Sequence, residues 1–410
     1  MRFTLPLVAA ALVLAGCASL ERNPVPPELV ASASLPGLPD IRAAAGAQSA
    51  AMQRDLALSF EQDSEEDFPA GADGVVRYPL LAISGGGANG AFGAGFLNGW
   101  TATGKRPVFK IVTGVSTGAL MAPFVFLGPD YDQTLRDFYT TTRSQDIFVR
   151  GSLLRQLLSG ESIADTAPLR AIIARIVDES LLRQVAEEHR RGRRLYVGTT
   201  NLDTQQFMVW NMGKIATSGH PEALELFREV TLASASIPVA FPPVFFEVEA
   251  GGQTYDEMHV DGAVTANTFV TAGVFRPSLA RTQAGSRPGR DDLFVIHNGQ
   301  LFAIPSPKKR TVRGIALRSM EAAGRAGMLD ELVRIYAFAL REDAGYAWVG
   351  IPQGINLTGG EIFDPVVMRE LFELGYRRAL EGPTWSALPP GFGSVEEWGL
   401  QPSAPPPVKE

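Results

Sequence analysis

The chain has 410 residues, of which 45% are hydrophobic and 20% are charged, so its composition excludes a wholly disordered or fibrous protein. Its 37 Lys and Arg residues against 44 Asp and Glu residues give a net charge of −7, which excludes a bulk attraction to nucleic acid. The single cysteine, Cys17, excludes an internal disulfide and a cysteine-rich zinc site.

The N-terminus has the pattern of a secretion signal. Met1 and Arg2 precede the apolar run Phe3–Ala15, which is shorter than the roughly 20 residues that cross a bilayer. The run ends in Leu14-Ala15-Gly16-Cys17, which resembles the lipobox of bacterial lipoproteins, where cleavage precedes a cysteine that carries lipid. An ordinary signal peptide, or a buried helix with an incidental cysteine, is the alternative. We predict a lipoprotein signal peptide over residues 1–16 and a membrane anchor on Cys17. The expected location is the bacterial cell envelope, facing the periplasm.

Residues 17–77 are rich in Ala, Pro and Ser and contain the acidic run Glu61–Asp67, which predicts a tether with limited structure. From Tyr78 onward, short β-prone runs alternate with helical segments, a pattern typical of βα units on a largely parallel sheet. The predicted strands are Leu80–Ile83, Val108–Val112, Leu195–Val197, Phe207–Trp210, Val244–Val248, Met258–Val260 and Leu293–Ile296.

The C-terminal part continues this pattern. Val312–Arg341 and Pro365–Leu380 have helical periodicity, and Tyr346–Val349 between them is extended. We therefore predict one α/β domain, in which residues 276–381 complete the part over residues 78–275. A Pro- and Gly-rich tail is expected over residues 382–410.

A glycine-rich segment, Ser84-Gly85-Gly86-Gly87-Ala88-Asn89-Gly90, follows the first strand and opens a helical pattern. Clustered glycines let backbone amides approach an anion at a helix N-terminus. The spacing also matches the dinucleotide-binding fingerprint G-x-G-x-x-G, which requires an acidic residue about 20 positions later. Because no Asp or Glu occurs between Ala91 and Pro129, the sequence disfavours a dinucleotide site. A plain structural turn is the other interpretation.

The second motif is Gly114-Val115-Ser116-Thr117-Gly118, between the strand Val108–Val112 and the apolar run Ala119–Leu127. This is the context of the G-x-S-x-G nucleophile elbow, in which a tight strand-to-helix turn exposes the serine hydroxyl. The third motif is Asp261-Gly262-Ala263, after the strand Met258–Val260. A carboxylate at a strand end can accept a proton from a serine, although Asp-Gly is also a common turn.

Together the three segments resemble the patatin-like phospholipase family, bacterial members included, over roughly residues 78–274. That family uses a Ser–Asp dyad without histidine. The resemblance implies a three-layer α/β/α fold with a central, mainly parallel sheet. It implies that Ser116 is the nucleophile, that Asp261 is the base, and that Gly85, Gly86 and Gly87 form the oxyanion loop. Asn89 departs from the family, because many members carry Arg or Lys at this position.

The resemblance further implies hydrolysis of lipid acyl esters, phospholipid or lysophospholipid first, through an acyl-enzyme and without a cofactor. No spacing of His, Asp and Glu predicts a metal site. The basic clusters His189–Arg194 and Lys308–Arg310 are expected to be solvated loops. The expected partners are the lipid substrate and the membrane that holds Cys17, with no nucleic acid.

Two other functions stay open at this point. Ser116, Asp261 and His297 occur in the chain order of a Ser-His-Asp esterase or lipase, so chain order does not separate a triad from a dyad. His259 lies two residues before Asp261 and is expected to share its face of a strand. The second alternative is a lipid-anchored binding protein that keeps the fold without the activity.

Overall fold

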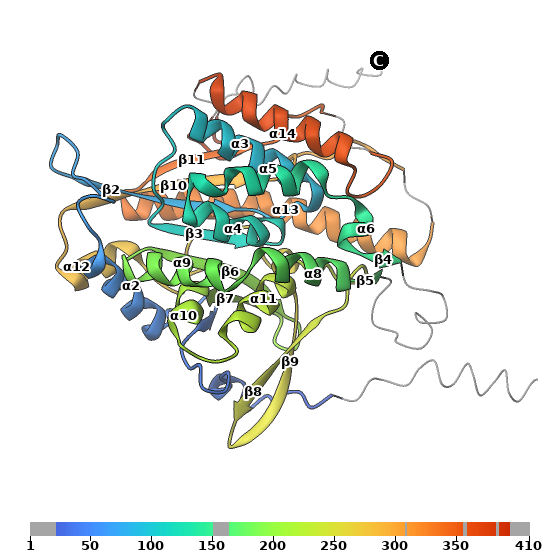
Figure 1. The fold of residues 1–410 in the computed structure, drawn as a ribbon, viewed down its shortest axis with the longest axis horizontal. Coiled ribbons are helices and arrows are strands. Elements are labelled where there is room, and N and C mark those ends of the chain that lie inside the picture. Colours follow the sequence, from blue (N-terminus) through green and yellow to red (C-terminus); the bar gives the residue numbers. More distant parts are fainter. Residues whose placement is uncertain (1–21, 151–163, 308–309, 356–358, 383–384, 394–410) are drawn as a thin grey trace, which may run out of the picture.

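The computed structural model describes residues 22–150, 164–307, 310–355, 359–382 and 385–393. A nine-stranded sheet runs through this part of the chain, and helices cover both of its faces (Figure 1). The predicted signal peptide and Cys17 lie outside the described residues.

The strands follow the order β1-β7-β6-β3-β2-β10-β11, and β9 pairs with both β6 and β8. The neighbours from β6 to β11 are parallel, whereas the pairs that involve β1, β7, β8 or β9 are antiparallel. The bounds are β1 Arg42–Ala44, β2 Val76–Ile83, β3 Ile111–Val115, β6 Arg194–Asn201, β7 Gln206–Asn211, β8 Val244–Ala250, β9 Gln253–Asp261, β10 Gly289–His297 and β11 Gly345–Gly350. A separate pair joins β4 Val149–Arg150 to β5 Ala164–Asp165.

The strand sequences reflect how each strand is covered. The central strand β2 is buried almost throughout, because a parallel strand between two helical layers has no solvent face. Leu81 and Ile83 enter the hydrophobic core on one face of the sheet, and Leu80 and Ala82 enter the core on the other. By contrast, β8 alternates strictly between buried and exposed residues, as expected of a strand with one face in water.

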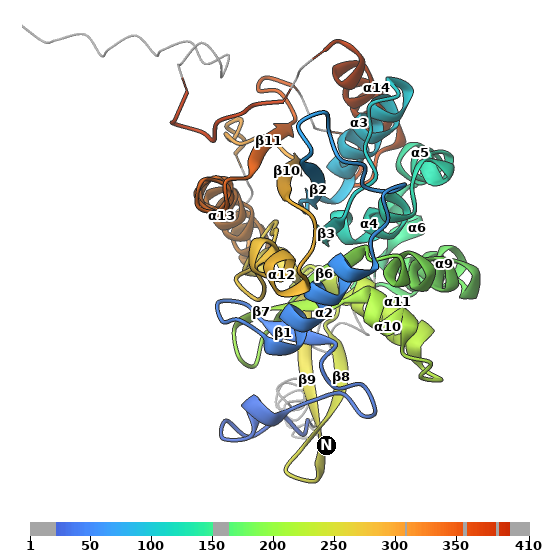
Figure 2. The same ribbon diagram turned by 90° about the vertical axis from the view of Figure 1, so that its left-hand side faces the viewer.

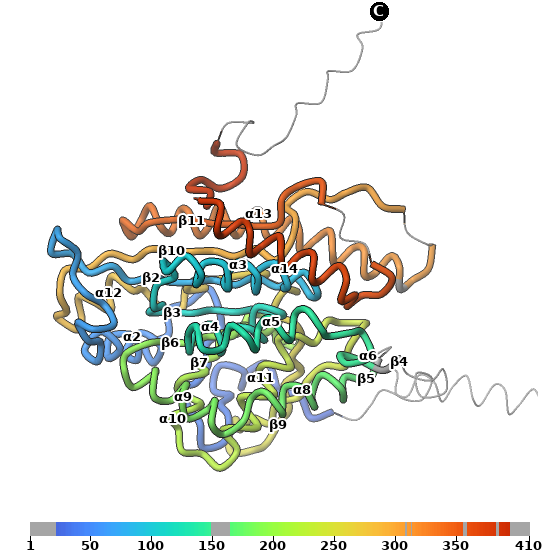
Figure 3. The backbone as a smooth tube through the Cα atoms, turned by 45° about the horizontal axis from the view of Figure 1, so that its top comes forward, coloured from blue at the N-terminus to red at the C-terminus, as the bar shows by residue number. Residues whose placement is uncertain are grey.

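The helices form two layers (Figure 2). One layer contains α3 Gly90–Ala102, α4 Thr117–Leu127, α5 Asp132–Thr141, α9 Glu179–Arg190 and α14 Pro365–Leu380. The opposite layer contains α2 Ala50–Gln62, α12 Pro277–Ala284 and α13 Val312–Glu342. The helix α14 lies along α3 (Figure 3). The predicted three-layer α/β fold with a central, mainly parallel sheet is confirmed.

Shorter elements complete the domain. They are the helices α6 Ser144–Ile147, α8 Ala167–Ile176, α10 Met212–Thr217 and α11 Ala223–Ser234, and the 3-10 helices η1 Val30–Ser32, η2 Gly87–Asn89, η3 Pro129–Tyr131 and η4 Gly262–Val264.

The N-terminal segment is a correction to the sequence analysis. A tether was expected over residues 17–77, but residues 22–77 are largely packed onto the domain. Helix α2 buries Met52, Leu56 and Phe60 in the core beneath the sheet, because their spacing of four places them on one helix face. Ser49 caps this helix by accepting a hydrogen bond from the Met52 amide. The Ala- and Ser-rich composition concealed this apolar stripe.

The C-terminal part shares the same sheet, since β10 pairs with β2 and β11 pairs with β10. The predicted tail over residues 382–410 is also corrected in part. Trp385 packs edge-on against Phe96, Trp100 and Phe294, with ring centroids 5.0–5.2 Å away. Residues 394–410 lie outside the described residues.

The basic cluster His189–Arg194 is only partly the solvated loop that was expected, because Arg190 and Arg191 alone of its arginines are exposed. Arg193 and Arg194 are buried, and the guanidinium of Arg194 donates to the carboxylate of Asp55 at 2.7 Å. The guanidinium of Arg193 donates to the backbone carbonyl of Phe109. These arginines therefore join helices to the sheet. In the other cluster, Lys308 and Lys309 lie outside the described residues.

Candidate active site

Ser116 lies on the sharp turn between β3 and α4, with φ 56° and ψ −124°. A positive φ is unfavourable for a residue with a side chain, so the surrounding contacts must hold this conformation. The Ser116 amide donates to Oγ of Ser234 at 2.9 Å, and that hydroxyl donates to the Gly198 carbonyl at 2.6 Å. A Cβ at Gly118 would collide with the carbonyl oxygen of Ile83, so only glycine lets α4 start this close to β2.

The sheet topology explains how Ser116 meets Asp261. Strand β7 occupies one edge of β6, and β3 and β9 share the other edge. Val115 at the end of β3 pairs with Gly198, and Asp261 at the end of β9 pairs with the next residue, Thr199. Because β3 is parallel and β9 antiparallel to β6, their C-terminal ends face each other. The fold thus brings together two residues that lie 145 positions apart.

The two side chains are in direct contact. Oγ of Ser116 donates a hydrogen bond to Oδ2 of Asp261 at 2.6 Å, and the Ala263 amide donates to Oδ1 at 2.8 Å. Burial raises the pKa of Asp261 to about 7, against the hydrogen bonds from Ser116 and Ala263, which lower it. A carboxyl group with this pKa can exchange a proton with a serine hydroxyl near neutral pH.

The glycine loop passes beside Ser116. A Cβ at Gly85 would lie 3.1 Å from Cβ of Ser116, and a Cβ at Gly86 would collide with the Asn298 carbonyl oxygen. The Gly85 amide donates to the Asn267 carbonyl at 3.0 Å. For the amides of Gly86 and Gly87, no acceptor is present in the described part of the chain. The Gly85 amide is already bonded, so it is not available to bind an oxyanion. Of the three glycines that were expected to form the oxyanion loop, Gly86 and Gly87 have amides that are free to do so.

Comparison with known families matches residues 81–273 to the patatin-like phospholipase model, a span that holds the glycine loop, Ser116 and Asp261. This stretch of the chain is therefore similar to the patatin-like phospholipase family. The family supports lipid acyl hydrolase activity, the general class predicted from the sequence. No curated protein matches the chain.

Two solved structures are similar to this chain. VipD from Legionella pneumophila is 13% identical, with a TM-score of 0.38, and the match covers 77% of this chain and 69% of VipD. The second is the complex of full-length SpcU with full-length ExoU from the type III secretion system of Pseudomonas aeruginosa. It is 13% identical, with a TM-score of 0.24, and the match covers 74% of this chain and 51% of the other. The present chain therefore spans about half the length of that second relative.

Neither His297 nor His259 makes a hydrogen bond with Ser116 or Asp261. Nδ1 of His297 lies 3.2 Å from Oγ of Ser84, behind the glycine loop. Burial and the charge of Arg325 lower the pKa of His297 to about 4. His259 shares its strand with Asp261, as expected, but its ring lies between Thr199 and the carboxylate of Glu257.

The sequence analysis assigned no role to the residues that support the site. Ser234 fixes the backbone of Ser116, and Asn267 fixes the backbone of Gly85. Asn298 holds the glycine loop from the other side, because its side chain donates to the Ser84 carbonyl at 3.0 Å and accepts from the Gly93 amide at 3.1 Å. None of these residues belongs to a spaced motif. Only their nearness to the motifs in space identifies them.

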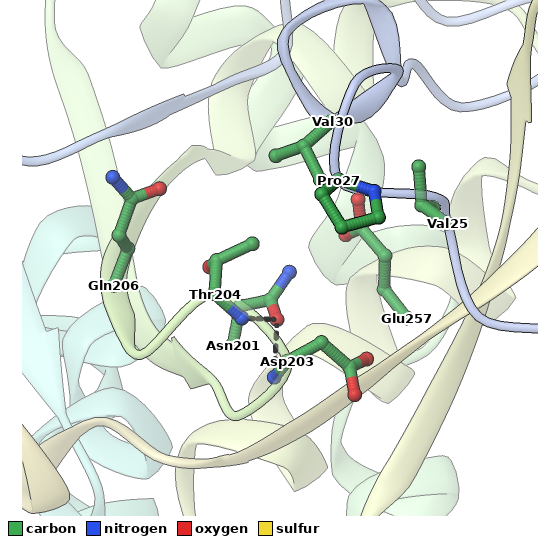
Figure 4. A pocket seen from close by; sticks show the side chains of 8 residues that line it. All are labelled: Val25, Pro27, Val30, Asn201, Asp203, Thr204, Gln206 and Glu257. Atoms are coloured by element: carbon green, nitrogen blue, oxygen red, sulfur yellow. Dashed lines mark hydrogen bonds between the residues drawn. The ribbon is translucent and has the colours of Figure 1, made fainter.

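A pocket of about 280 Å³ lies between the N-terminal segment and the turn that joins β6 to β7 (Figure 4). Its lining includes Glu257 of β9, four residues before Asp261. It is lined by Val25, Pro27, Val30, Asn201, Asp203, Thr204, Gln206 and Glu257. Neither Ser116 nor Asp261 lines it, so this pocket is separate from the candidate active site.

Within the described ranges, no group of three or more His, Cys, Asp and Glu residues is arranged to hold a metal ion. In the same residues, no helix has both the length and the apolar character needed to cross a membrane.

Proposed function

We propose that the protein is a serine hydrolase that cleaves lipid acyl esters through a Ser116–Asp261 dyad. The observation that carries the proposal is the 2.6 Å hydrogen bond between Oγ of Ser116 and Oδ2 of Asp261, inside a buried site. The family supports the reaction class, and this contact supports the assignment of the two residues.

The first half of the reaction forms an acyl-enzyme. The Asp261 carboxylate takes the proton of Ser116 as Oγ attacks the ester carbonyl carbon. The amides of Gly86 and Gly87, which lack acceptors among the described residues, donate to the oxyanion of the tetrahedral intermediate. When the intermediate collapses, the carboxyl group of Asp261 gives the proton to the leaving alkoxide. Ser116 then carries the acyl group.

The second half releases the acyl group. A water molecule gives a proton to Asp261 as its oxygen attacks the acyl carbonyl, and the same two amides stabilise the second oxyanion. Collapse breaks the bond to Oγ and returns the proton from Asp261 to Ser116. One residue thus serves as base and acid in both halves, which requires a pKa near the working pH. The pKa of about 7 for Asp261 meets this requirement.

We propose a phospholipid or lysophospholipid as the substrate class. The experiment that tests the function is product analysis on a mixed panel of phospholipids and lysophospholipids, with an alkyl phosphonate probe that labels reactive serines. Wild type should release fatty acid and take up the probe.

Ser116→Ala should lose both properties, on the order of 10⁴-fold or more in turnover, and keep the wild-type unfolding midpoint. Ser32→Ala, which alters an exposed serine, is the matched control and should behave as wild type. Equal labelling of Ser116→Ala and wild type would show that Ser116 is not the nucleophile.

We further propose that lipid on Cys17 holds the domain close to its membrane. The Arg22 guanidinium donates to both carboxylate oxygens of Asp203 at 2.8 Å, and its Nε donates to Asp256 at 2.8 Å. From Cys17 to Arg22 the chain can extend at most roughly 18 Å. From Asp256 to Asp261, β9 spans roughly 17 Å. The Arg22 and Asp256 side chains between these two stretches add roughly 10 Å, so the proposed base lies within roughly 45 Å of the anchor. The enzyme would therefore act on the membrane that holds it.

Mass spectrometry of the mature N-terminus tests the anchor. The expected species begins at Cys17 and carries acyl chains, and Cys17→Ser should move the protein from the membrane fraction to the soluble fraction. An unmodified Cys17, or cleavage at another position, would refute the anchor without affecting the proposed reaction.

A further inference from the structure

Helix α13 places a buried carboxylate behind the active site. Glu331 is 3% exposed, and its two carboxylate oxygens each accept a backbone hydrogen bond. Oε1 accepts from the Asn267 amide at 2.8 Å, and Oε2 accepts from the Thr268 amide at 3.0 Å. Residues 312–342 lie outside the span that matches the family model, so the family likeness does not account for Glu331.

The segment held by Glu331 is connected to both parts of the candidate site. The Asn267 carbonyl accepts the Gly85 amide at 3.0 Å, and Gly85 packs against Ser116. Upstream in the same segment, the amide of Ala266 donates to the Gly262 carbonyl at 2.9 Å, in the turn that follows Asp261. A displacement of Asn267 would therefore reach the glycine loop.

The shape of α13 allows this close approach. The side chain of Asn267 donates to the Gly324 carbonyl at 2.7 Å. A Cβ at Gly324 would lie 3.3 Å from Oδ1 of Asn267, and one at Gly327 would lie 3.4 Å from its Nδ2. Glycine inside a helix costs about 1 kcal/mol relative to alanine, so Gly324 on this face needs a packing reason. The side chain of Asn267, which packs against Gly324, supplies that reason.

We propose that Glu331 is a positioning residue for the oxyanion loop. It touches neither Ser116 nor Asp261 in the described contacts, and it acts by fixing Asn267, whose carbonyl fixes Gly85 and thereby the free amides of Gly86 and Gly87. A carboxylate suits this role, because it presents two acceptor oxygens to two adjacent amides. The inference rests on the proposed function, since it gives Glu331 a role in that reaction.

The test compares kcat and KM on a soluble acyl ester for wild type, Glu331→Gln and Glu331→Asp. In Glu331→Gln an NH₂ group replaces one acceptor and faces an amide donor, so the loop should shift. A shift of about 1 Å in a catalytic group lowers turnover on the order of 10²-fold, and we expect that loss in kcat with little change in KM. Glu331→Asp keeps both acceptor oxygens and should recover part of the loss.

Glu321→Gln is the matched control, because Glu321 is an exposed residue of the same helix that pairs with Arg318. It should retain wild-type kcat. Gly324→Ala is an independent variant that moves Asn267 without removing a charge, and it should also lower kcat while the unfolding midpoint is kept.

The outcomes separate the two proposals. Wild-type kcat in folded Glu331→Gln and Gly324→Ala would overturn the positioning role and leave the dyad untouched, provided Ser116→Ala is inactive. An active Ser116→Ala would overturn the proposed function itself. If Glu331→Gln does not fold, an unchanged kcat in Gly324→Ala refutes the positioning role, and a lowered kcat supports it.

Discussion

Two carboxylates on one face of β9 lie four residues apart and are nearly equally buried, yet they have opposite acidities. Glu257 is 5% exposed and Asp261 is 2% exposed. Burial by itself would raise the pKa of Glu257, but the hydrogen bonds from His259 and Arg42 and the charge of Arg42 hold it at about 2. Burial raises the pKa of Asp261 to about 7.

The difference comes from the side chains that donate to each carboxylate, because Glu257 accepts from His259 and from the charged guanidinium of Arg42. Arg42, on β1 of the N-terminal segment, lies 2.5 Å from Glu257 and also stacks over the ring of Trp210 at 5.2 Å. The hydrogen-bond donors to Asp261 are a serine hydroxyl and a backbone amide, both neutral. A carboxylate that is buried beside a cation stays charged and holds the fold together. A carboxylate that is buried without a cation can exchange protons near neutral pH.

Of the changes to these two carboxylates, Asp261→Asn is expected to have the larger effect on turnover, because it removes the proton acceptor. General base catalysis contributes up to about 10⁴-fold, so turnover should fall by about 10³-fold or more in a folded protein. The raised pKa of Asp261 means that the native state binds its proton more tightly than the unfolded chain. Its stabilising contribution is therefore complete below pH 4 and is lost as the pH rises to 7.

Asp261→Asn should then be more stable than wild type at pH 8, by roughly 2–4 kcal/mol. Urea unfolding of both proteins at pH 4 and pH 8 measures this difference. A variant that is inactive and also less stable at pH 8 would mean that the loss reflects damage to the fold.

Glu257→Gln should have the opposite effect: it should lower the stability of the fold and leave the turnover of the folded protein unchanged. It leaves the buried Arg42 guanidinium without a partner charge, and breaking a buried pair in this way costs about 3–5 kcal/mol of unfolding free energy. The depressed pKa of Glu257 adds stability above about pH 4.5, which is lost as the pH falls toward 2. Glu249→Gln, at an exposed position on β8, is the control. Loss of turnover in the folded fraction of Glu257→Gln would give this carboxylate a catalytic part.

The sequence predicted the pairing of Ser116 with Asp261 because local patterns mark both residues. Ser116 and Asp261 each follow a β-prone run and have a glycine within two positions, and both features are visible in a single sequence. The bounds of α14 were also predicted, since capping Asp364 and Pro365 mark its start. The predicted strand Val108–Val112 is β3 Ile111–Val115 in the structure, because pairing with β6 extends to the turn at Ser116.

The ion pair between Arg42 and Glu257 could not be predicted from the sequence. Arg42 lies in the segment that was expected to be a tether, and 215 positions separate it from Glu257. Glu331 shows the same limit, because its contacts with Asn267 depend on how α13 crosses the sheet. Such pairings leave no periodicity in the chain, and a single sequence provides no signal for them.

The pH dependence of kcat/KM should report the acidity of Asp261. The base is active only as a carboxylate, so kcat/KM should fall about tenfold per pH unit below pH 7 and reach a plateau above it. Burial also raises the pKa of Glu331 to about 7, so Glu331→Gln is the necessary control. The inflection should persist in that variant. Loss of the inflection in Glu331→Gln would assign the inflection to Glu331 and would contradict its assignment to Asp261.

Only a small effect on turnover is expected from His297→Ala. The ring of His297 contacts the Ser84 hydroxyl, and its pKa of about 4 keeps it neutral at the working pH. Its loss should disturb the backbone behind the glycine loop and lower kcat only a few-fold, whereas removal of the histidine from a working triad costs on the order of 10⁶-fold. Both His297→Ala and Asp261→Asn should be measured with one soluble ester at pH 8, with unfolding midpoints to show that each is folded. An inactive, folded His297→Ala would replace the dyad with a triad. An active Asp261→Asn would exclude both, because each mechanism requires that carboxylate.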